Sequence, residues 1–423
     1  MGNQIILREP GLENELIDTQ ALHSLALLKI QQQQWDEAYF LLKQALSSGS
    51  EPPELYNSLG YVCLSKKQFQ EAEEAFERAL TLNPHSVEAL NNLGNVKEAQ
   101  GNLSLAMVCY QQAIQLESHY VPAYLNLANG YLVQNSIQQA IQILQQGQKI
   151  NSTSVEISTQ LGTVYQLNGQ LEQAQHCFEH VLVLNPHYIK AYNNLGNVFQ
   201  ELGHWKEAAS LYQQALAIDN SQPELHNNLG SVWQHLKQFE SAIQCYQSAI
   251  DLKPDYSEAY YNLGNCFQEQ GEIAFAIQNY SLALQCDPNF AKAYNNLGSS
   301  LLYQGFAHKA LENFKKARSL ENKNPLFWSN FLFCLLYCEN ITYEEIIQEH
   351  VDWYQHMKAS YQKRYTTYQN IPDPNLRLKI AYIMRYLSSS NDPFFIKTIL
   401  KFAHKDKFEV HIFAAMNPHD SLF

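Results

Sequence analysis

The sequence predicts an all-α chain whose main part is a right-handed α-solenoid, a superhelix of about nine helical repeats. A helical cap and a small, incomplete α/β segment are expected to follow it. Two observations predict the solenoid. A Leu followed by Gly or Ala recurs every 34 residues without insertion or deletion, and an alanine stands twelve residues after each small residue. A change of pattern after Pro374 predicts the α/β segment. Because 46% of the residues are hydrophobic, disorder is excluded.

Each repeat is predicted to hold two amphipathic helices, because apolar residues recur at i, i+3, i+4 and i+7. The small residue lets the two helices approach closely, and a ring or Leu four residues after the alanine is expected to fill the space to the next repeat. The nine Leu-small dipeptides begin at Leu25, Leu59, Leu93, Leu127, Leu161, Leu195, Leu229, Leu263 and Leu297. Five glycines are expected to end first helices in the left-handed conformation, namely Gly101, Gly169, Gly203, Gly271 and Gly305.

This pattern resembles the tetratricopeptide repeat and covers nine units, from about Gln20 to Lys323. The resemblance implies that the first helices of the units line a concave groove. Pro325 to Cys338 begins like a tenth unit and is predicted to be a capping helix, with a further helix from about Tyr343 to Tyr361.

Asparagine recurs on one face of the first helices. The predicted peptide-groove residues are Asn92, Asn95, Asn126, Asn129, Asn194, Asn197, Asn228, Asn262, Asn265 and Asn296. Because Asn is a poor helix former, this recurrence needs a reason. A carboxamide offers both a donor and an acceptor, so a regular series can hold the backbone of an extended peptide. The series lapses at Ser58, Gln160 and Thr163.

Two structural explanations of the asparagines stay open at this point: inheritance from one duplicated repeat, and hydrogen bonds between neighbouring helices. On the peptide-groove hypothesis, changing Asn194, Asn228 and Asn262 to Ala should abolish peptide capture and leave thermal stability unchanged or slightly raised. A carboxylate clamp needs converging Lys and Arg side chains. Only Lys190 and Lys292 face the groove by position, which argues against a chaperone-tail receptor.

After Pro374 the sequence predicts a strand from Leu376 to Met384, a helix from Pro393 to Ala403 and a second strand from Phe408 to Ala415. One βαβ unit pairs its strands in parallel. Together with the asparagine-rich repeats, these segments resemble the protein O-linked N-acetylglucosamine transferase (Spindly-like) family, truncated at the C-terminus. The predicted domains are an N-terminal segment 1–18, nine repeats 19–324, capping and linker helices 325–365, and a partial glycosyltransferase-like βαβ segment 366–423.

The chain departs from that family where catalysis would occur. The family's Asp-Phe-x-x-His motif aligns with the stretch from Tyr386 to Ser390, and a second family His aligns with Phe394. The lobe that binds the sugar nucleotide would follow Phe423. We therefore predict no catalytic residues, cofactor or metal. If there is an activity, it is that of a UDP-sugar-dependent protein O-glycosyltransferase completed by a missing C-terminal lobe.

The net charge of −13 argues against nucleic acid or an anionic membrane surface as the main partner. Residues 1–16 lack the basic and apolar regions of a secretory signal. Cys109, Cys177 and Cys245 lie 68 residues apart and so occupy one position in three repeats. Buried thiols of this kind predict a reducing compartment, the cytoplasm.

The function predicted from sequence is a non-catalytic scaffold that binds a protein or extended peptide ligand in the asparagine-lined groove. The alternative is a truncated or degenerate transferase whose repeats dock protein substrates. A third hypothesis, an assembly factor, differs only in its partner. The sequence leaves open a homo-oligomer, and a separate chain that completes the C-terminal sheet.

Overall fold

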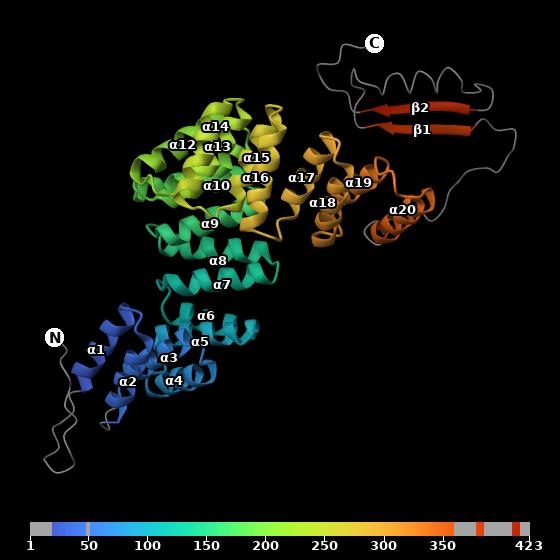
Figure 1. Cartoon of the computed structure of the whole chain (residues 1–423). Helices are drawn as coiled ribbons and strands as arrows, with labels where there is room; N and C mark the ends of the chain where they lie inside the picture. Colours follow the sequence, from blue (N-terminus) through green and yellow to red (C-terminus); the bar gives the residue numbers. More distant parts are fainter. Residues whose placement is uncertain (1–18, 48–50, 359–377, 385–407, 415–423) are drawn as a thin grey trace, which may run out of the picture. The chain divides into compact units, whose positions relative to one another are not determined.

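A computed structural model of the chain describes residues 19–47, 51–358, 378–384 and 408–414. It forms two compact units, Met1–Trp353 and Tyr354–Phe423. In the first unit, pairs of helices follow one another in chain order (Figure 1). None of the described helices combines the length and apolar character that a bilayer-spanning segment needs.

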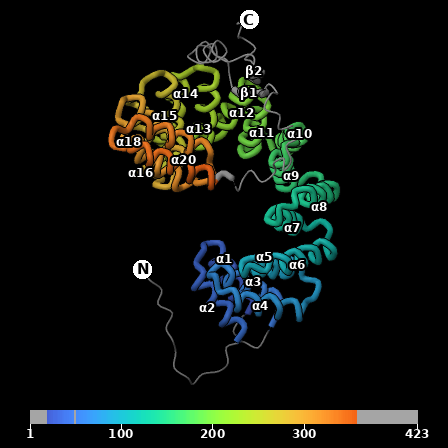
Figure 2. Tube along the Cα trace, turned by 90° about the vertical axis from the view of Figure 1, so that its right-hand side faces the viewer, coloured from blue at the N-terminus to red at the C-terminus, as the bar shows by residue number. Residues whose placement is uncertain are grey.

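Nine helix pairs correspond to the nine predicted repeats. The first helices are α1 (Thr19–Gln31), α3 (Pro53–Ser65), α5 (Val87–Ala99), α7 (Val121–Val133), α9 (Val155–Leu167), α11 (Ile189–Glu201), α13 (Pro223–His235), α15 (Ser257–Glu269) and α17 (Ala291–Tyr303). The second helices are α2 (Trp35–Leu46), α4 (Phe69–Leu82), α6 (Leu103–Leu116), α8 (Ile137–Ile150), α10 (Leu171–Leu184), α12 (Trp205–Ile218), α14 (Phe239–Leu252), α16 (Ile273–Cys286) and α18 (Ala307–Leu320). Each first helix packs on its own second helix, which in turn packs on the next first helix, so the repeats form a continuous stack (Figure 2).

The core consists of the residues that define the repeat. The nine predicted alanines are fully buried, and so are the rings or Leu four residues later, from Leu42 to Tyr280, with Phe314 at 1% exposure. A Cβ at Gly264 would lie 2.7 Å from the ring of Tyr280, so only glycine allows this ring its place. Tyr280 also shares a buried cluster with Leu297 of the next repeat, as expected for a ring that fills the space between repeats. Leu25, in the first of the described repeats, is 42% exposed.

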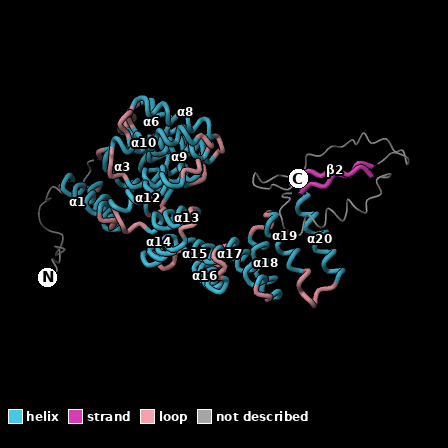
Figure 3. Tube along the Cα trace, turned by 90° about the horizontal axis from the view of Figure 1, so that it is seen from above, coloured by secondary structure: helices cyan, strands magenta, loops and turns pink. Residues whose placement is uncertain are grey.

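Short loops join the helices (Figure 3). The five predicted glycines have φ between +72° and +85°, which confirms their left-handed conformation at the ends of first helices. In four other repeats a non-glycine residue takes this place with positive φ, namely Gln33, Lys67, Asn135 and Lys237. Asn tolerates that conformation, whereas Gln and Lys disfavour it, so at Gln33, Lys67 and Lys237 the tertiary stack imposes it.

The predicted cap is present as α19 (Pro325–Leu335), followed by α20 (Tyr343–Lys358). Arg318 of α18 holds the cap in place. Its guanidinium carbon lies 4.3 Å from the ring centroid of Trp328 and 4.0 Å from that of Phe331, and its Nη1 lies 2.7 Å from a carboxylate oxygen of Glu349. Burial of these rings ends the stack.

The second unit contains two described strands, β1 (Leu378–Met384) and β2 (Phe408–Ala414). They pair in parallel, with Leu378 opposite Phe408 and Met384 opposite Ala414. The helix expected from Pro393 to Ala403 and the stretch from Tyr386 to Ser390 lie outside the described residues. The βαβ unit and the four-part domain division therefore stay predictions.

Candidate functional site

The ten predicted asparagines lie on the first helices α5, α7, α11, α13, α15 and α17. We call the surface that they form the ladder face. Its first row is the residue before each repeat Leu, namely Asn92, Asn126, Asn194, Asn228, Asn262 and Asn296. Its second row stands three positions later and comprises Asn95, Asn129, Asn197 and Asn265. Asn129 is exposed and the other nine are half-buried, so solvent or a ligand reaches this face.

Five of the six first-row asparagines bond their repeat to the one before it. The Nδ2 group donates to the side chain that lies 35 residues earlier, on the neighbouring first helix. The bonds are Asn92 to Asn57 Oδ1 (3.2 Å), Asn126 to Asn91 Oδ1 (2.9 Å), Asn228 to Asn193 Oδ1 (2.9 Å), Asn262 to Asn227 Oδ1 (3.0 Å) and Asn296 to the Tyr261 hydroxyl (3.1 Å). Of the two structural explanations, hydrogen bonds between neighbouring helices are thus present.

The second-row asparagines accept hydrogen bonds through their Oδ1 atoms. Asn95 Oδ1 takes hydrogen bonds from the Tyr110 hydroxyl (2.9 Å) and from Asn126 (3.1 Å). Asn265 Oδ1 takes them from Tyr280 (2.8 Å) and Asn296 (2.9 Å). The remaining bonds are Tyr212 to Asn197 at 2.6 Å and Gln160 to Asn129 at 2.5 Å. Burial raises the pKa of Tyr110, Tyr212 and Tyr280, so these hydroxyls stay protonated donors.

These internal bonds leave one half of the carboxamide unused in eight of the ten asparagines. In Asn296 both halves are bonded, because its Oδ1 accepts from Asn295 Nδ2. Among the described residues, nothing donates to Oδ1 of Asn92, Asn126, Asn228 or Asn262, and nothing accepts from Nδ2 of the four second-row asparagines. The first row therefore offers acceptors and the second row offers donors. Hydrogen bonds to the neighbouring repeats fix which half of each carboxamide is unused, and the sequence alone does not reveal this.

The lapses in the fifth repeat have two different outcomes. Gln160 is one methylene longer than Asn and still reaches Asn129 Oδ1 and the Leu125 carbonyl. Thr163, the other lapse, donates its hydroxyl to the carbonyl of Thr159 at 3.0 Å, within its own helix. Thr159, which stands where Asn227 stands two repeats later, likewise donates to the carbonyl of Val155 at 2.6 Å. In the described part of the chain, Asn194 has no side-chain hydrogen bond.

Sequence reasoning missed two further parts of the ladder face. Asn330 of α19, 34 residues after Asn296, donates to Asn295 Oδ1 at 2.8 Å and extends the first row by one step. Glutamines at a third position form a parallel seam, in which Gln166 donates to Glu201 (2.6 Å) and Gln234 to Glu269 (2.7 Å). Recurrence at 34 residues was the signal for both.

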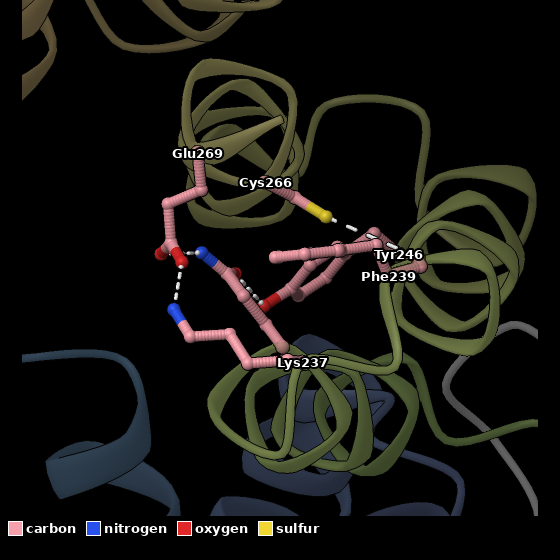
Figure 4. A network of polar contacts seen from close by, with 6 residues as sticks. Lys237, Phe239, Tyr246, Cys266 and Glu269 are labelled. Atoms are coloured by element: carbon pink, nitrogen blue, oxygen red, sulfur yellow. Dashed lines mark hydrogen bonds and ion pairs between the residues drawn. The ribbon is translucent and has the colours of Figure 1, made fainter. Parts of the chain in front are cut away.

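Figure 4 shows this seam between α13 and α15. The Tyr246 hydroxyl donates to Gln234 Oε1 at 2.8 Å, and Lys237 Nζ lies 2.6 Å from Glu269 Oε2. Burial alone would raise the pKa of Glu269, but the hydrogen bonds from Lys237 and Gln234 outweigh it and lower that pKa. Glu269 is therefore a carboxylate at neutral pH. Beside it lies a polar pocket of about 400 Å³, lined by Gln234, Asn265, Gln268, Glu269 and Asn296.

The described residues form neither a metal-binding cluster nor an activated thiol. No three His, Cys, Asp or Glu side chains of the described ranges come together as metal ligands. All eight cysteines are free thiols, six of them buried. Desolvation raises the pKa of Cys63 and Cys177 to about 11, so neither is an activated nucleophile.

Two family models match the chain. The tetratricopeptide repeat matches residues 53–86 and 257–290, and the C-terminal ARM domain of tetratricopeptide repeat protein 21 matches residues 85–261. Neither is a glycosyltransferase model, so the transferase resemblance stays a prediction. No curated protein sequence matches significantly.

Solved structures are also similar. MamA is 28% identical over 38% of this chain and 95% of its own, with a TM-score of 0.35. YrrB, described as a TPR protein with an unusual peptide-binding site, is 25% identical over 44% of this chain and 96% of its own (TM-score 0.35). Yeast Tom70 is 16% identical over 80% of this chain and 84% of its own (TM-score 0.46). The chain thus contains tetratricopeptide repeats at residues 53–86 and 257–290, within a stack of nine described helix pairs.

Proposed function

We propose that the chain is a non-catalytic scaffold that binds an extended polypeptide on the ladder face. One observation carries the proposal: the first row leaves carbonyl oxygens unused and the second row leaves N–H groups unused. An extended backbone carries one donor and one acceptor at every residue. Paired rows of acceptors and donors complement such a backbone regardless of its side chains.

The energetics favour several contacts in series. One hydrogen bond contributes a net ~0.5–1.5 kcal/mol, so a single amide gives little affinity. Asn92 with Asn95, Asn126 with Asn129 and Asn262 with Asn265 repeat the same pair of groups on three helices. Because the inner half of each carboxamide is already bonded, its orientation is fixed before the ligand arrives, which reduces the entropy lost on binding.

A conservative substitution tests the role of the outward donors. Changing Asn95, Asn129 and Asn265 together to Asp keeps the oxygens that accept from Tyr110, Gln160 and Tyr280, and removes the unused N–H groups of these three side chains. The control carries the same three charges on exposed residues of second helices, as Gln112→Glu, Gln213→Glu and Gln244→Glu.

The probe is a phage-displayed library of random 16-residue peptides, selected on the full chain. Enriched peptides are then titrated by fluorescence anisotropy. We expect at least tenfold weaker binding to the Asp variant and unchanged binding to the control. Equal binding to the Asp variant, or no enrichment on the wild-type chain, would contradict the proposal.

The transferase alternative draws support from the parallel pairing of β1 and β2, which the βαβ prediction requires. It predicts binding of UDP-N-acetylglucosamine by the full chain, and calorimetry without a binding signal would remove it. We also propose a reducing location, the cytoplasm, because all eight cysteines are unpaired thiols.

A further inference from the structure

A second pocket lies on the ladder face where the asparagines end. It measures about 370 Å³, within the range of about 300–1,000 Å³ common for ligand pockets. Its lining comes from α17, α18 and α19 and from Tyr337, two residues after the end of α19. The lining residues are Ser299, Leu302, Tyr303, Phe314, Asn330, Phe333 and Tyr337. None of these side chains carries a charge at neutral pH.

This pocket repeats the polar pocket of about 400 Å³ one repeat later, with changed chemistry. Ser299 stands 34 residues after Asn265, Leu302 after Gln268, and Tyr303 after Glu269. Asn330 repeats Asn296 and keeps its bond to the preceding helix, at 2.8 Å to Asn295 Oδ1. The scaffold that orients the backbone-binding amide is thus retained, while two amides and a carboxylate are replaced by smaller, aliphatic and aromatic groups.

Three of the aromatic side chains that line this apolar pocket are exposed to solvent. Tyr303 is 80% exposed, Tyr337 54% and Phe333 53%, whereas Phe314 at the base is 1% exposed. The rings of Phe333 and Tyr337 lie with centroids 5.1 Å apart. Open aromatic rings above a buried one present a site for a large apolar side chain.

The first helices that precede the apolar pocket are rich in acidic residues. The first helices α3 to α15 carry eight Glu and two Lys, and one of these, Lys97, is bound to Glu73 of α4. Glu224, Glu258 and Glu269 belong to the two first helices that precede α17. The one charged residue of α17 is Lys292, and α19 has none, so the acidic surface is that of α13 and α15. An acidic face selects a basic partner, so the segment that crosses these helices should be basic.

We infer that the apolar pocket seats one large apolar side chain, preferably aromatic, of a lysine- or arginine-containing polypeptide that lies extended along the ladder face. This rests on the proposed function and adds to it the sequence preference. The amide rows bind any backbone, and the pocket fixes the register of the chain that they hold.

Three fluorescein-labelled 16-residue peptides test the inference on the full chain. The anchor peptide has Lys, Ser, Thr and Gly around a central Trp, the alanine peptide has Ala in place of Trp, and the acidic peptide has Glu in place of Lys. We expect the anchor peptide to bind about tenfold more tightly than the alanine peptide, as burial of one large side chain implies. The acidic peptide should bind more weakly than the anchor peptide.

The double variant Tyr303→Ala with Phe333→Ala should abolish the preference for Trp and leave binding of the alanine peptide unchanged. Its control, Phe40→Ala with Phe275→Ala, removes two exposed aromatics of second helices (68% and 50% exposed) and should change neither. Both pairs are at least half exposed, so the fold tolerates them.

The two ideas fail differently. Equal binding of the anchor and alanine peptides overturns the inference and leaves the proposed function standing, whereas no binding of any peptide counts against both. Self-association that the double variant removes would assign the pocket to a second copy of the chain, and would also overturn the inference.

Discussion

The Nδ2 group of Asn262 donates to Oδ1 of Asn227 across two neighbouring first helices, at 3.0 Å. Asn227 is 8% exposed, so its carbonyl depends on this donor. The bond joins consecutive repeats, and it decides both the stability and the outward polarity of the ladder face.

Alanine in the first row should destabilise the fold, whereas the peptide-groove hypothesis from sequence expected unchanged or slightly raised thermal stability. Asn262→Ala leaves a buried acceptor unsatisfied and should lower the free energy of unfolding by about 1–3 kcal/mol. Asn194→Ala is the matched control. Asn194 makes no hydrogen bond among the described residues, and Ala is the better helix former, so its midpoint in urea should be unchanged or slightly raised. Equal loss in both variants would refute the role of the bond.

Two tyrosines should respond oppositely to removal of the hydroxyl. The Tyr110 hydroxyl lies 2.9 Å from two acceptors, Asn95 Oδ1 and Glu98 Oε2, and can donate its proton to either. The Tyr124 hydroxyl, by contrast, is buried without a partner among the described residues. Tyr110→Phe should cost about 1 kcal/mol of stability, and Tyr124→Phe should be neutral or stabilising. Urea titration of both variants measures this, and destabilisation by Tyr124→Phe would contradict it.

Glycine at a turn that already has positive φ should stabilise the stack. Lys67 has φ 60° and an exposed side chain without a partner in the described structure. The left-handed conformation costs a non-glycine residue about 1–2 kcal/mol, and the greater freedom of glycine in the unfolded chain offsets about 0.4–1 of this. Lys67→Gly should therefore raise the unfolding midpoint. Gly203→Ala, at φ 80°, is the converse and should lower it.

Alkaline pH should weaken the fold through the buried thiols. Burial raises the pKa of Cys63, Cys177, Cys245 and Cys266 to about 11, above the unfolded value of about 8.5. A raised folded pKa contributes stability that is complete below about pH 8.5 and is lost as pH rises towards 11. Urea midpoints measured from pH 7 to pH 10.5 should fall, and they should fall less in Cys177→Ala. A urea midpoint that rises with pH, or one that falls equally steeply with pH in Cys177→Ala, would show that the buried thiols are not the cause.

Much of the fold was predictable because the repeat signal is local and repeated. Spacing alone identified the helix pairs, the buried alanines and the left-handed glycines. The left-handed turns at Gln33 and Lys67 were not predictable, because the stack imposes a conformation that those residues disfavour.

The ladder face was predictable in its residues and not in its bonds. The partner of Asn262 depends on how two neighbouring helices are placed, which no single repeat encodes. The apolar pocket was missed for another reason: the repeat spacing does not distinguish an exposed aromatic residue from a buried one, and the exposure of Tyr303 and Phe333 is seen only in the structure.

The measurement that tests the central claim most directly is an NMR titration of the full chain, labelled with ¹⁵N on asparagine, with a peptide enriched from the random library. The side-chain NH₂ resonances are followed one residue at a time, assigned by single substitutions. Resonances of Asn95, Asn129 and Asn265 should shift, while that of Asn262, already bonded to Asn227, should move least. Shifts confined to asparagines outside the ladder face, such as Asn313 on α18, would contradict peptide binding at these rows.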